Sequence, residues 1–428
     1  MTDKVSHTVE LIIQSLNQQG LGIASWQGKE VQVPFTAVGD RVLVEIIVEE
    51  ANLISAKLLT RVQNGQDYIQ AVCKHFEECG GCALQHLKPE NYQQWKLQSL
   101  IAAFHQQGLK IDPAPLFSVP PKTRRRVNLI ASKNVHGQLL LGFQRYRSHE
   151  IIDIQECPVM LPELERLLRP LRQLLQAMLK KRQEVEVFLI KADNGIDLLL
   201  KAKMALSVQS RLLLTEFAGL NRLCRLEWQQ EGKGFDLVYQ EVAPLIYWQQ
   251  IAIELPTEAF IQPTKASEAY MQGLIGDYLK PAKKIADLFA GCGTFSFPLA
   301  KSGKTVHAIE GHMSAIEAMN KAANRFQLTA KLTTECRNLA KYPLSMQELN
   351  MFDAVIFDPP RQGALPQMQQ LAFSHVPYVV AVSCNPETLA RDLQILTQQG
   401  YRLEKIFPID QFLWSTHLEA VALLKRPT

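Results

Sequence analysis

The last third of the chain alternates short apolar segments with segments of helical periodicity, and this pattern restricts the fold more than any other feature. The apolar segments predict five strands, at Lys284–Leu288, Thr305–Glu310, Ala354–Phe357, Tyr378–Ser383 and Glu419–Leu424. Helices are predicted between them at Phe297–Lys301, Ser314–Phe326, Leu365–Phe373 and Pro386–Gln398. Apolar strands that alternate with helices are typical of a parallel, doubly wound α/β sheet covered on both faces. Ligands of such sheets bind at the carboxyl ends of the strands.

Two further regions are expected before this sheet, since 428 residues suffice for two or three domains. Residues 1–65 contain short runs that alternate apolar and polar side chains, such as Arg41–Val48, with glycines between them. They predict a closed β-barrel of the OB type, because closure leaves no exposed strand edge. Residues 66–250 begin with clustered cysteines, contain a helix at 92–108 and then become strand-rich, which indicates a middle domain. Residues 251–428 form the domain of the predicted sheet.

The bulk composition excludes several classes of protein. A net charge of +4 is too small by itself to indicate a nucleic-acid partner. No apolar run is long enough to span a bilayer, and Met1–Lys4 lacks the basic start of a secretion signal, so we expect a cytoplasmic protein without a membrane partner. Eight cysteines without an export signal do not indicate a disulfide framework. We expect a monomer.

Local basic clusters are more informative than the total charge. One is Lys122–Arg126, and a second places Arg145 and Arg147 beside Tyr146 and Phe143. Basic groups could neutralise phosphates and the rings could stack on bases. A solvated face of the protein is an equally good interpretation of each cluster taken alone.

A glycine-containing turn, Asp287–Phe295, follows the first predicted strand of the sheet. Gly291 and Gly293 stand where a backbone bends tightly and approaches a ligand before a helix begins. The third glycine of a dinucleotide fingerprint is missing, whereas D-x-F-x-G-x-G is common in Rossmann-like methyltransferases that bind S-adenosylmethionine. Glu310, one strand later, offers a carboxylate to two ribose hydroxyls. An ordinary turn with a surface glutamate is the alternative.

Asp358 follows the strand Ala354–Phe357 and begins an Asp-Pro-Pro sequence. The prolines stiffen the turn. Many nucleic-acid methyltransferases use a similar sequence to position an amine, so on its own it favours an N-methyltransferase. Methylation of an amine needs no thiol nucleophile, and the next strand ends at a thiol.

Cys384 stands between Tyr378–Ser383 and the predicted helix Pro386–Gln398. A sharp strand-to-helix turn exposes a side chain, and the positive end of the helix dipole stabilises a thiolate. A small buried cysteine is the simpler interpretation of an isolated Cys at a strand end. The neighbouring motifs favour a nucleophile instead.

A thiol and a late glutamate together suit methylation of a pyrimidine carbon. C5 of uracil is a poor nucleophile, and addition of a thiolate to C6 gives it carbanion character. A base must afterwards remove the C5 proton, and hydrogen bonds at O4 and N3 steady the enolate. Glu419, at the head of the last predicted strand, is our candidate base. A solvated glutamate at a strand edge is the alternative.

Four cysteines could bind a metal centre: Cys73, Cys79, Cys82 and Cys157. Structural zinc usually takes two closely spaced pairs of ligands, whereas here three are grouped and a distant fourth precedes Pro158. This pattern favours a [4Fe–4S] cluster. Gly80-Gly81 would let the chain fold tightly around it, which disfavours free thiols, and His75 and His86 are weaker candidate ligands. The cluster has no evident part in polar methyl transfer, so we expect a structural or RNA-positioning role.

In combination these motifs resemble the RNA uracil-C5 methyltransferases over nearly the whole chain. The resemblance includes a leading barrel similar to the TRAM domain and the cysteine cluster. The other matching segments are Ser148–Pro158, Phe260–Gln262, Asp287–Gly293, Asp358–Arg361, Ser383–Pro386 and His417–Glu419. Thr294 and Pro263-Thr264 stand where the family often has asparagines.

The resemblance implies that Cys384 is the nucleophile, that Glu419 is the base and that the cysteines hold a [4Fe–4S] cluster. Residues implied at the pocket for the cofactor and target base are Gln262, Phe289, Gly291, Gly293, Thr294, Glu310, Asn338 and Asp358. We expect a uridine of 23S rRNA as the substrate, flipped out of its stack. Methylation of tRNA is one alternative, and a non-catalytic RNA-binding or ribosome-assembly factor is another.

Overall fold

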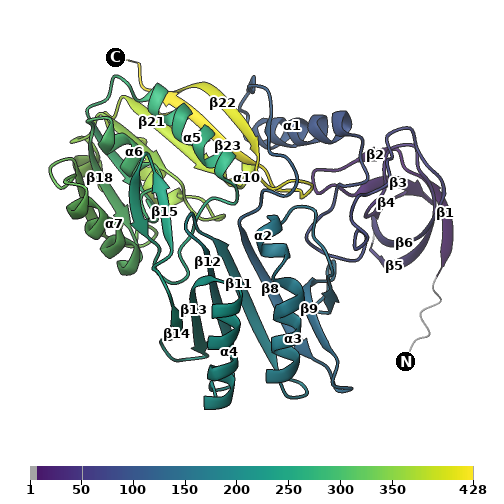
Figure 1. Ribbon diagram of the computed structural model, residues 1–428. Coiled ribbons are helices and arrows are strands. Elements are labelled where there is room, and N and C mark those ends of the chain that lie inside the picture. Colours follow the sequence, from purple (N-terminus) through teal and green to yellow (C-terminus); the bar gives the residue numbers. More distant parts are fainter. Residues whose placement is uncertain (1–6, 51, 428) are drawn as a thin grey trace.

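The computed structural model describes residues 7–50 and 52–427, which form three larger β-sheets and one two-stranded hairpin (Figure 1). The first four residues, to which the expectation about a secretion signal refers, lie outside the described part. Within that part, every helix is too short or too polar to cross a membrane.

The C-terminal sheet has eight strands in the order β19-β18-β17-β20-β21-β23-β22-β7. Their bounds are β7 (Phe117–Ser118), β17 (Lys284–Leu288), β18 (Thr305–Glu310), β19 (Leu332–Cys336), β20 (Ala354–Phe357), β21 (Tyr378–Ser383), β22 (Arg402–Asp410) and β23 (Glu419–Lys425). The five predicted strands are confirmed. Four of them are almost entirely buried, as continuous apolar runs require, and β18 is half buried.

Helices cover both faces of this sheet and enclose two hydrophobic cores. One core contains α5 (Lys265–Tyr278), α6 (Ser296–Lys301), α7 (Met313–Arg325) and the hairpin β15 (Leu245–Trp248) and β16 (Ile251–Glu254). The opposite core contains α1 (Pro89–Gln106), α8 (Met346–Leu349), α9 (Leu365–Leu371) and α10 (Pro386–Gln398). The doubly wound architecture is therefore confirmed.

The predicted parallel arrangement holds for only part of the sheet. β19, β18, β17, β20 and β21 are parallel, but β23 inserts antiparallel between β21 and β22. β22 escaped prediction because its exposed half alternates polar and apolar residues. The reversal matters for the site, because it brings the beginning of β23 to the carboxyl end of β21.

The middle sheet has seven strands in the order β10-β9-β8-β11-β12-β13-β14. They are β8 (Arg126–Lys133), β9 (Leu139–Gln144), β10 (Ile151–Asp153), β11 (Glu184–Lys191), β12 (Ile196–Ala202), β13 (Leu223–Gln230) and β14 (Phe235–Gln240). The helices α2 (Pro162–Glu165), α3 (Leu168–Met178) and α4 (Val208–Leu220) pack on it and share its core (Figure 1).

The N-terminal barrel contains β1 (Thr8–Ile12), β2 (Ser15–Leu16), β3 (Gly22–Trp26), β4 (Lys29–Val33), β5 (Arg41–Glu49) and β6 (Leu53–Gln63). β1 pairs with β5 at one end of the strand order, and β2 pairs with β3 at the other. Because β1 and β2 follow one another directly, these pairings close the barrel. Inward-facing side chains such as Val31, Val42 and Ile54 are fully buried.

The helix α1 lies apart from the middle sheet. Its residues Leu100 and Phe104 belong to the core of the C-terminal sheet, and the next strand, β7, pairs with β22. The predicted boundary at residue 251 also falls inside the β15–β16 hairpin. The division into domains 1–65, 66–250 and 251–428 remains a prediction. It assigns α1 to the middle domain, although α1 contacts the C-terminal part.

Candidate active site

The polar ends of three neighbouring strands meet in one cavity of about 1520 Å³. Asp358 follows β20, Cys384 follows β21, and Glu419 begins β23. Ser383 pairs with Ala420 at the end of the antiparallel ladder. Cys384, which follows Ser383, and Glu419, which precedes Ala420, therefore emerge at the same edge of the sheet. All three predicted side chains line the cavity together with the glycine turn after β17.

Two buried carboxylates dominate the electrostatics of this edge. Glu419 is only 3% exposed, and burial, followed by the charge of Asp358, raises its pKa well above the ordinary value. Burial likewise raises the pKa of Asp358, although the Gln262 amide, which donates to it over 3.1 Å, acts in the opposite direction. Two like charges in a low-dielectric site disfavour simultaneous ionisation. The pair therefore titrates as a unit, at a higher pH than ordinary carboxylates do.

Gln411 connects these groups and was missed by the sequence analysis. Its Nε2 donates to Glu419 over 2.6 Å and to the Gln262 Oε1 over 3.0 Å, while its Oε1 accepts from Ser267 over 2.7 Å. The Ser267 hydroxyl thereby orients the Gln411 amide, and Gln411 in turn directs the Gln262 amide toward Asp358. No sequence motif marks Gln411, which stands directly after an irregular strand.

The Cys384 thiol lies in an environment that opposes ionisation. Burial and the charges of Glu419 and Asp358 together raise its pKa to about 11, although Arg361 acts to lower it. The expectation that the helix N-terminus favours the thiolate is therefore wrong for the free protein. Local acceptors already occupy that end of α10, since Asn385 accepts from the Glu387 N–H and Ser383 accepts from the Asn385 N–H.

The predicted cofactor turn has the geometry of a ligand cradle. Phe289, Gly291 and Gly293 have positive φ angles of 60°, 55° and 94°. A Cβ on Gly293 would approach the Phe297 ring to 2.7 Å, so this position requires glycine. A Cβ on Gly291 would meet nothing within 4 Å, which leaves its backbone accessible to a ligand.

Two acidic side chains, Asp287 and Glu310, accept hydrogen bonds at this turn. Asp287 is 1% exposed; burial raises its pKa to about 7, and the Ser296 hydroxyl donates to one of its oxygens over 2.5 Å. No group in the described chain donates to its other oxygen. Glu310 lines the cavity, and its oxygens accept the N–H groups of Gly291 over 2.9 Å and of Gly311 over 2.7 Å. Thr294, which is 9% exposed, also lines the cavity.

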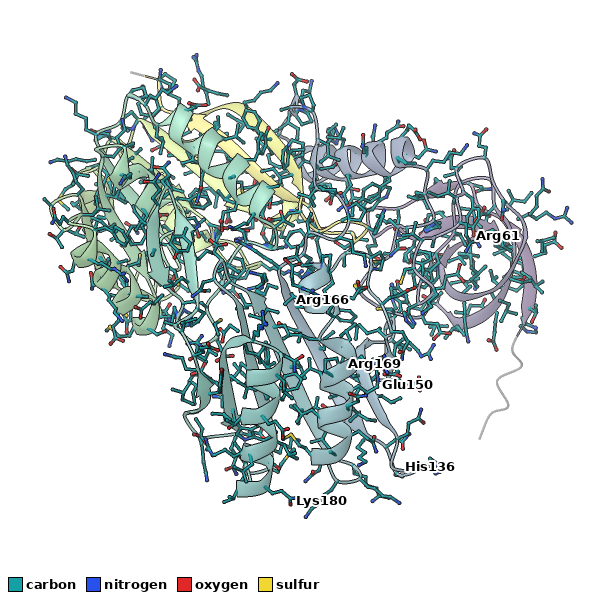
Figure 2. The ribbon with its side chains drawn as sticks, viewed as in Figure 1. Arg61, His136, Glu150, Arg166, Arg169 and Lys180 are labelled. Atoms are coloured by element: carbon teal, nitrogen blue, oxygen red, sulfur yellow. The ribbon has the colours of Figure 1, made fainter. Side chains whose placement is uncertain are left out.

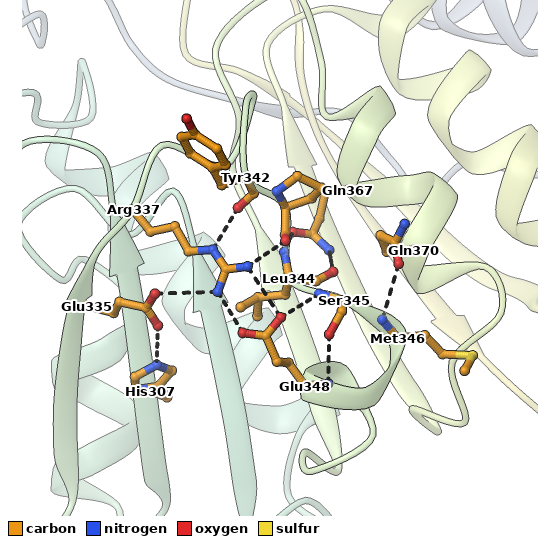
Figure 3. A network of polar contacts seen from close by, with 11 residues as sticks. His307, Glu335, Arg337, Tyr342, Leu344, Ser345, Met346, Glu348, Gln367 and Gln370 are labelled. Atoms are coloured by element: carbon orange, nitrogen blue, oxygen red, sulfur yellow. Dashed lines mark hydrogen bonds and ion pairs between the residues drawn. The ribbon is translucent and has the colours of Figure 1, made fainter.

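Asn338 lines the cavity. Its neighbour Arg337 holds the segment that follows in place (Figure 3). The Arg337 guanidinium donates to the carbonyls of Tyr342 and Pro343 over 2.7 and 2.6 Å and pairs with Glu348 over 2.6 Å. The Asn338 carboxamide accepts the Ala340 N–H over 3.1 Å, which fixes its turn. Because its oxygen already serves this turn, Asn338 has less capacity for a ligand than the sequence suggested.

The four candidate metal ligands Cys73, Cys79, Cys82 and Cys157 line another wall of the same cavity. Burial, together with the neighbouring cysteines, raises the pKa of Cys79 to about 11 and that of Cys82 to about 12. Within residues 7–50 and 52–427, no three His, Cys, Asp or Glu side chains are close enough to share one metal ion. His75 also lines the cavity and accepts the Gln155 N–H over 3.2 Å, whereas His86 is buried.

The basic cluster Lys122–Arg126 does not form one solvated face. Arg125 is 2% exposed; it pairs with Glu268 over 2.6 Å and donates to the Gln262 carbonyl over 2.9 Å. It is therefore unavailable to phosphates, contrary to expectation. Arg124 and Arg126 do line the cavity, and the Arg126 guanidinium lies 4.3 Å from the centre of the Phe260 ring.

Comparisons with known proteins identify the family and the fold. The family described as tRNA (Uracil-5-)-methyltransferase matches residues 236–427, and the TRAM domain of tRNA (uracil(54)-C(5))-methyltransferase matches residues 9–53. The crystal structure of the Pyrococcus abyssi tRNA (uracil-54, C5)-methyltransferase in complex with S-adenosyl-L-homocysteine shares the fold, with a TM-score of 0.73 and 22% identity. It covers 97% of this chain and 100% of that one.

Two relatives match over nearly their whole length. An RNA methyltransferase of Mesorhizobium japonicum is 40% identical over 415 residues, which is 97% of each chain. The 23S rRNA (uracil(1939)-C(5))-methyltransferase of Shewanella sediminis is 32% identical and covers 99% of this chain and 97% of its own. The chain therefore belongs to the family of S-adenosylmethionine-dependent RNA uracil-C5 methyltransferases.

Proposed function

We propose that this enzyme methylates C5 of a uridine in 23S rRNA, with Cys384 as the nucleophile and Glu419 as the base. The observation that carries the proposal is the convergence of Cys384, Asp358 and Glu419 in the cavity that the glycine turn also lines. The ribosomal substrate is supported by the relative from Shewanella sediminis, which aligns over the full length including the barrel. The enzyme would act as a monomer in the cytoplasm.

The chain fits S-adenosylmethionine, whose sulfonium supplies an electrophilic methyl group when bound. Gly291 offers an accessible backbone, and Phe289, Gly293, Thr294, Glu310 and Asn338 would complete the binding site around it. The unpartnered buried oxygen of Asp287 lies beneath this turn. These groups suit a ligand that carries both a cation and hydroxyl groups.

The chemistry follows from the side chains at the strand ends. Cys384 Sγ adds to C6 of the uracil, and the electrons of the C5=C6 bond move toward O4. C5 then forms a bond to the methyl carbon as the carbon–sulfur bond of the donor breaks. Glu419 accepts the C5 proton, and the electrons of the C–H bond restore C5=C6 and expel the Cys384 thiolate. Gln262 and Asp358 would hydrogen-bond the uracil edge and steady the enolate.

The raised pKa of Cys384 indicates when the thiolate forms. Arg361 is the cation that favours the thiolate, whereas two carboxylates oppose it. Protonation of the coupled pair Asp358 and Glu419 would remove one of these opposing charges. We infer that a substrate whose uracil hydrogen-bonds Asp358 changes this balance and generates the nucleophile in the complex.

We also propose that Cys73, Cys79, Cys82 and Cys157 hold a [4Fe–4S] cluster. They meet at one wall of the cavity, yet they are too widely spaced to share a single ion. A cluster binds each thiolate through a different iron, so its ligands are spaced more widely than those of zinc. Anaerobic purification should yield iron and acid-labile sulfide in about equal amounts. Stoichiometric zinc without sulfide would contradict the assignment.

Exposed basic side chains on the middle domain supply a route for RNA binding. Figure 2 shows Arg166 and Arg169 on the segment from α2 to α3, and both are exposed. Arg124 and Arg126 extend the positive charge into the cavity. Such contacts would position the RNA backbone while the cavity receives the extruded base.

The test of the proposed function has two parts. Purified enzyme and its Cys384→Ala variant are incubated with S-adenosylmethionine and with 23S rRNA or tRNA that lack 5-methyluridine. We expect 5-methyluridine in rRNA with the wild-type enzyme and none with the variant. Methylation confined to tRNA would identify the alternative substrate. Methylation by Cys384→Ala would exclude the nucleophile, and RNA binding without methylation would favour a ribosome-assembly factor.

A further inference from the structure

The loop between β22 and β23 comprises residues 411–418. It connects Gln411 to Glu419, two residues of the hydrogen-bond network in the cavity. Gln411 is its first residue, and Glu419 follows its last. The loop contains no helix or strand, and Trp414 has a left-handed backbone with φ 59°. A non-glycine residue keeps such a conformation only where its surroundings impose it.

Two side chains of α1 hold this loop at its beginning, middle and end. The Tyr92 hydroxyl donates to Asp410 Oδ2 over 2.5 Å and accepts the Trp414 N–H over 2.8 Å. Lys96 Nζ donates to Asp410 Oδ1 over 3.0 Å and to the His417 carbonyl. The helix therefore fixes both ends of the loop that separates Gln411 from Glu419.

These contacts are completely enclosed. Lys96 and Asp410 are both 0% exposed, and Tyr92 is 5% exposed. Burial lowers the pKa of Lys96, while Asp410 acts to raise it. Apolar residues of similar volume often stabilise a fold as well as a buried ion pair does, so stability alone gives no reason for this one. What the polar cluster adds is direction, because each hydrogen bond specifies where one point of the loop lies.

The other side of the loop is held as well. The N–H groups of Ala83 and Leu84, which directly follow Cys82, donate to the Trp414 carbonyl over 2.8 and 3.0 Å. The loop is thus clamped between α1 and the cysteine segment. The cysteine segment hydrogen-bonds the loop only through backbone groups at Trp414, whereas Tyr92 and Lys96 hydrogen-bond it or the adjacent Asp410 through their side chains at both ends.

We propose that Tyr92 and Lys96 are positioning residues for the proton-abstraction step, acting through Asp410 and the loop 411–418 on Gln411 and Glu419. This inference rests on the proposed role of Glu419 as the base. It assigns to α1, which is about 300 residues away along the chain, the alignment of the Glu419 carboxylate with the C5 proton. A displacement of 1 Å in such an alignment can reduce a rate about a hundredfold.

The inference separates two chemical steps. Cys384 follows β21 and does not belong to the loop, so addition to C6 and methyl transfer should continue when the loop shifts. Removal of the C5 proton should slow. Because expulsion of the thiolate waits for that step, the methylated RNA would remain bonded to Cys384 as a complex that survives denaturation.

The test uses Tyr92→Phe, which removes one hydroxyl and keeps the ring, and the double variant Lys96→Met with Asp410→Leu, which removes both buried charges together. Tyr247→Phe and Lys88→Met, at exposed positions, are the matched controls. Each protein is mixed with [5-³H]uridine RNA and S-adenosylmethionine. Tritium release, the covalent adduct on a denaturing gel, and RNA affinity are measured, with thermal unfolding to confirm the fold.

We expect tritium release to fall about tenfold or more in both test variants while RNA affinity stays within about twofold, and adduct formed from ordinary uridine RNA to accumulate. Both controls should match the wild type. Unchanged tritium release in Tyr92→Phe and in the folded double variant would overturn the inference, as would an equal loss of adduct and of tritium release. If the wild-type enzyme formed no adduct even with 5-fluorouridine RNA, the proposed function itself would fail and the inference with it.

Discussion

The reactivity of Cys384 in the free enzyme follows directly from the charges around it. Its pKa rises from the ordinary 9.0 to about 11, so at a pH below both values the thiolate fraction is about a hundredfold smaller than for an unperturbed thiol. Iodoacetamide reacts with the thiolate. We therefore expect Cys384 to be alkylated more slowly than the exposed Cys336 at pH 7.5, followed peptide by peptide with mass spectrometry.

Changing the neighbouring charge tests the cause of this low reactivity. In Glu419→Gln the carboxylate that most strongly opposes the thiolate is gone, so alkylation of Cys384 should become faster while that of Cys336 stays constant. Between pH 7 and 9 the rate at Cys384 should rise about tenfold for each pH unit, because its pKa lies above this range. A rate at Cys384 that equals or exceeds that of Cys336 and levels off below pH 8 would refute the reasoning.

Three further substitutions test individual contacts. Gln411→Leu removes the donor that lowers the pKa of Glu419, so less of the base is ionised at neutral pH; we expect the acidic limb of the kcat profile to move to higher pH. Gly293→Ala places a methyl group against a phenylalanine ring at a φ of 94° and should abolish binding of S-adenosylhomocysteine, measured by calorimetry. Arg125→Met leaves Glu268 buried without its cation and should lower the free energy of unfolding by about 3–5 kcal/mol in urea titrations at pH 7.5. The pKa of Glu268 is already raised by burial, so its ionised form disfavours the fold as the pH rises, and the loss should shrink at pH 5.5.

Matched variants indicate whether these effects are specific. Gly276→Ala lies where an added Cβ meets nothing within 4 Å, so it should bind S-adenosylhomocysteine normally. Arg169→Met removes an exposed charge and should change the unfolding free energy little. If Gln411→Leu left the pH profile unchanged, Gln411 would not influence the ionisation of Glu419. Equal stability of Arg125→Met and Arg169→Met would refute the buried ion pair.

Five of the eight strands of the C-terminal sheet were predictable because their sequences are mostly apolar and buried, whereas β7, β19 and β22 were missed. Four of the five predicted strands have the expected bounds, and the fifth extends one residue further, to Lys425. Glycines, prolines and polar residues interrupt the apolar pattern sharply at each end. The same local signal located Asp358, Cys384 and Glu419, since polar residues that follow or begin buried strands stand at the edges of the sheet.

The direction of β23 could not be predicted in this way. Parallel and antiparallel strands in the centre of a sheet have the same apolar composition, so no residue of Glu419–Lys425 reveals its orientation. Yet the antiparallel pairing is what brings Glu419 beside Cys384. The chemistry of uracil methylation and the resemblance to the family, rather than periodicity, paired these two residues.

Polar contacts between segments that are distant in the chain could not be predicted from the sequence either. Lys96 meets Asp410 and Arg125 meets Glu268 across long stretches of chain. In a sequence, lysine and arginine indicate exposure, and only the folded arrangement pairs and buries them. For the same reason the environment of Cys384 was misjudged: the helix that follows it was visible, but the two carboxylates that oppose its ionisation were not.

The central claim is that Cys384 bonds covalently to a uracil ring during methylation. Enzyme, S-adenosylmethionine and RNA with 5-fluorouridine at the target position are incubated, denatured and digested, and the adduct is sequenced by mass spectrometry. Fluorine cannot leave as a proton does, so the account predicts a methylated 5-fluorouridine attached to Cys384 and no adduct with Cys384→Ala. The absence of any adduct with active enzyme, or attachment at another residue, would contradict it.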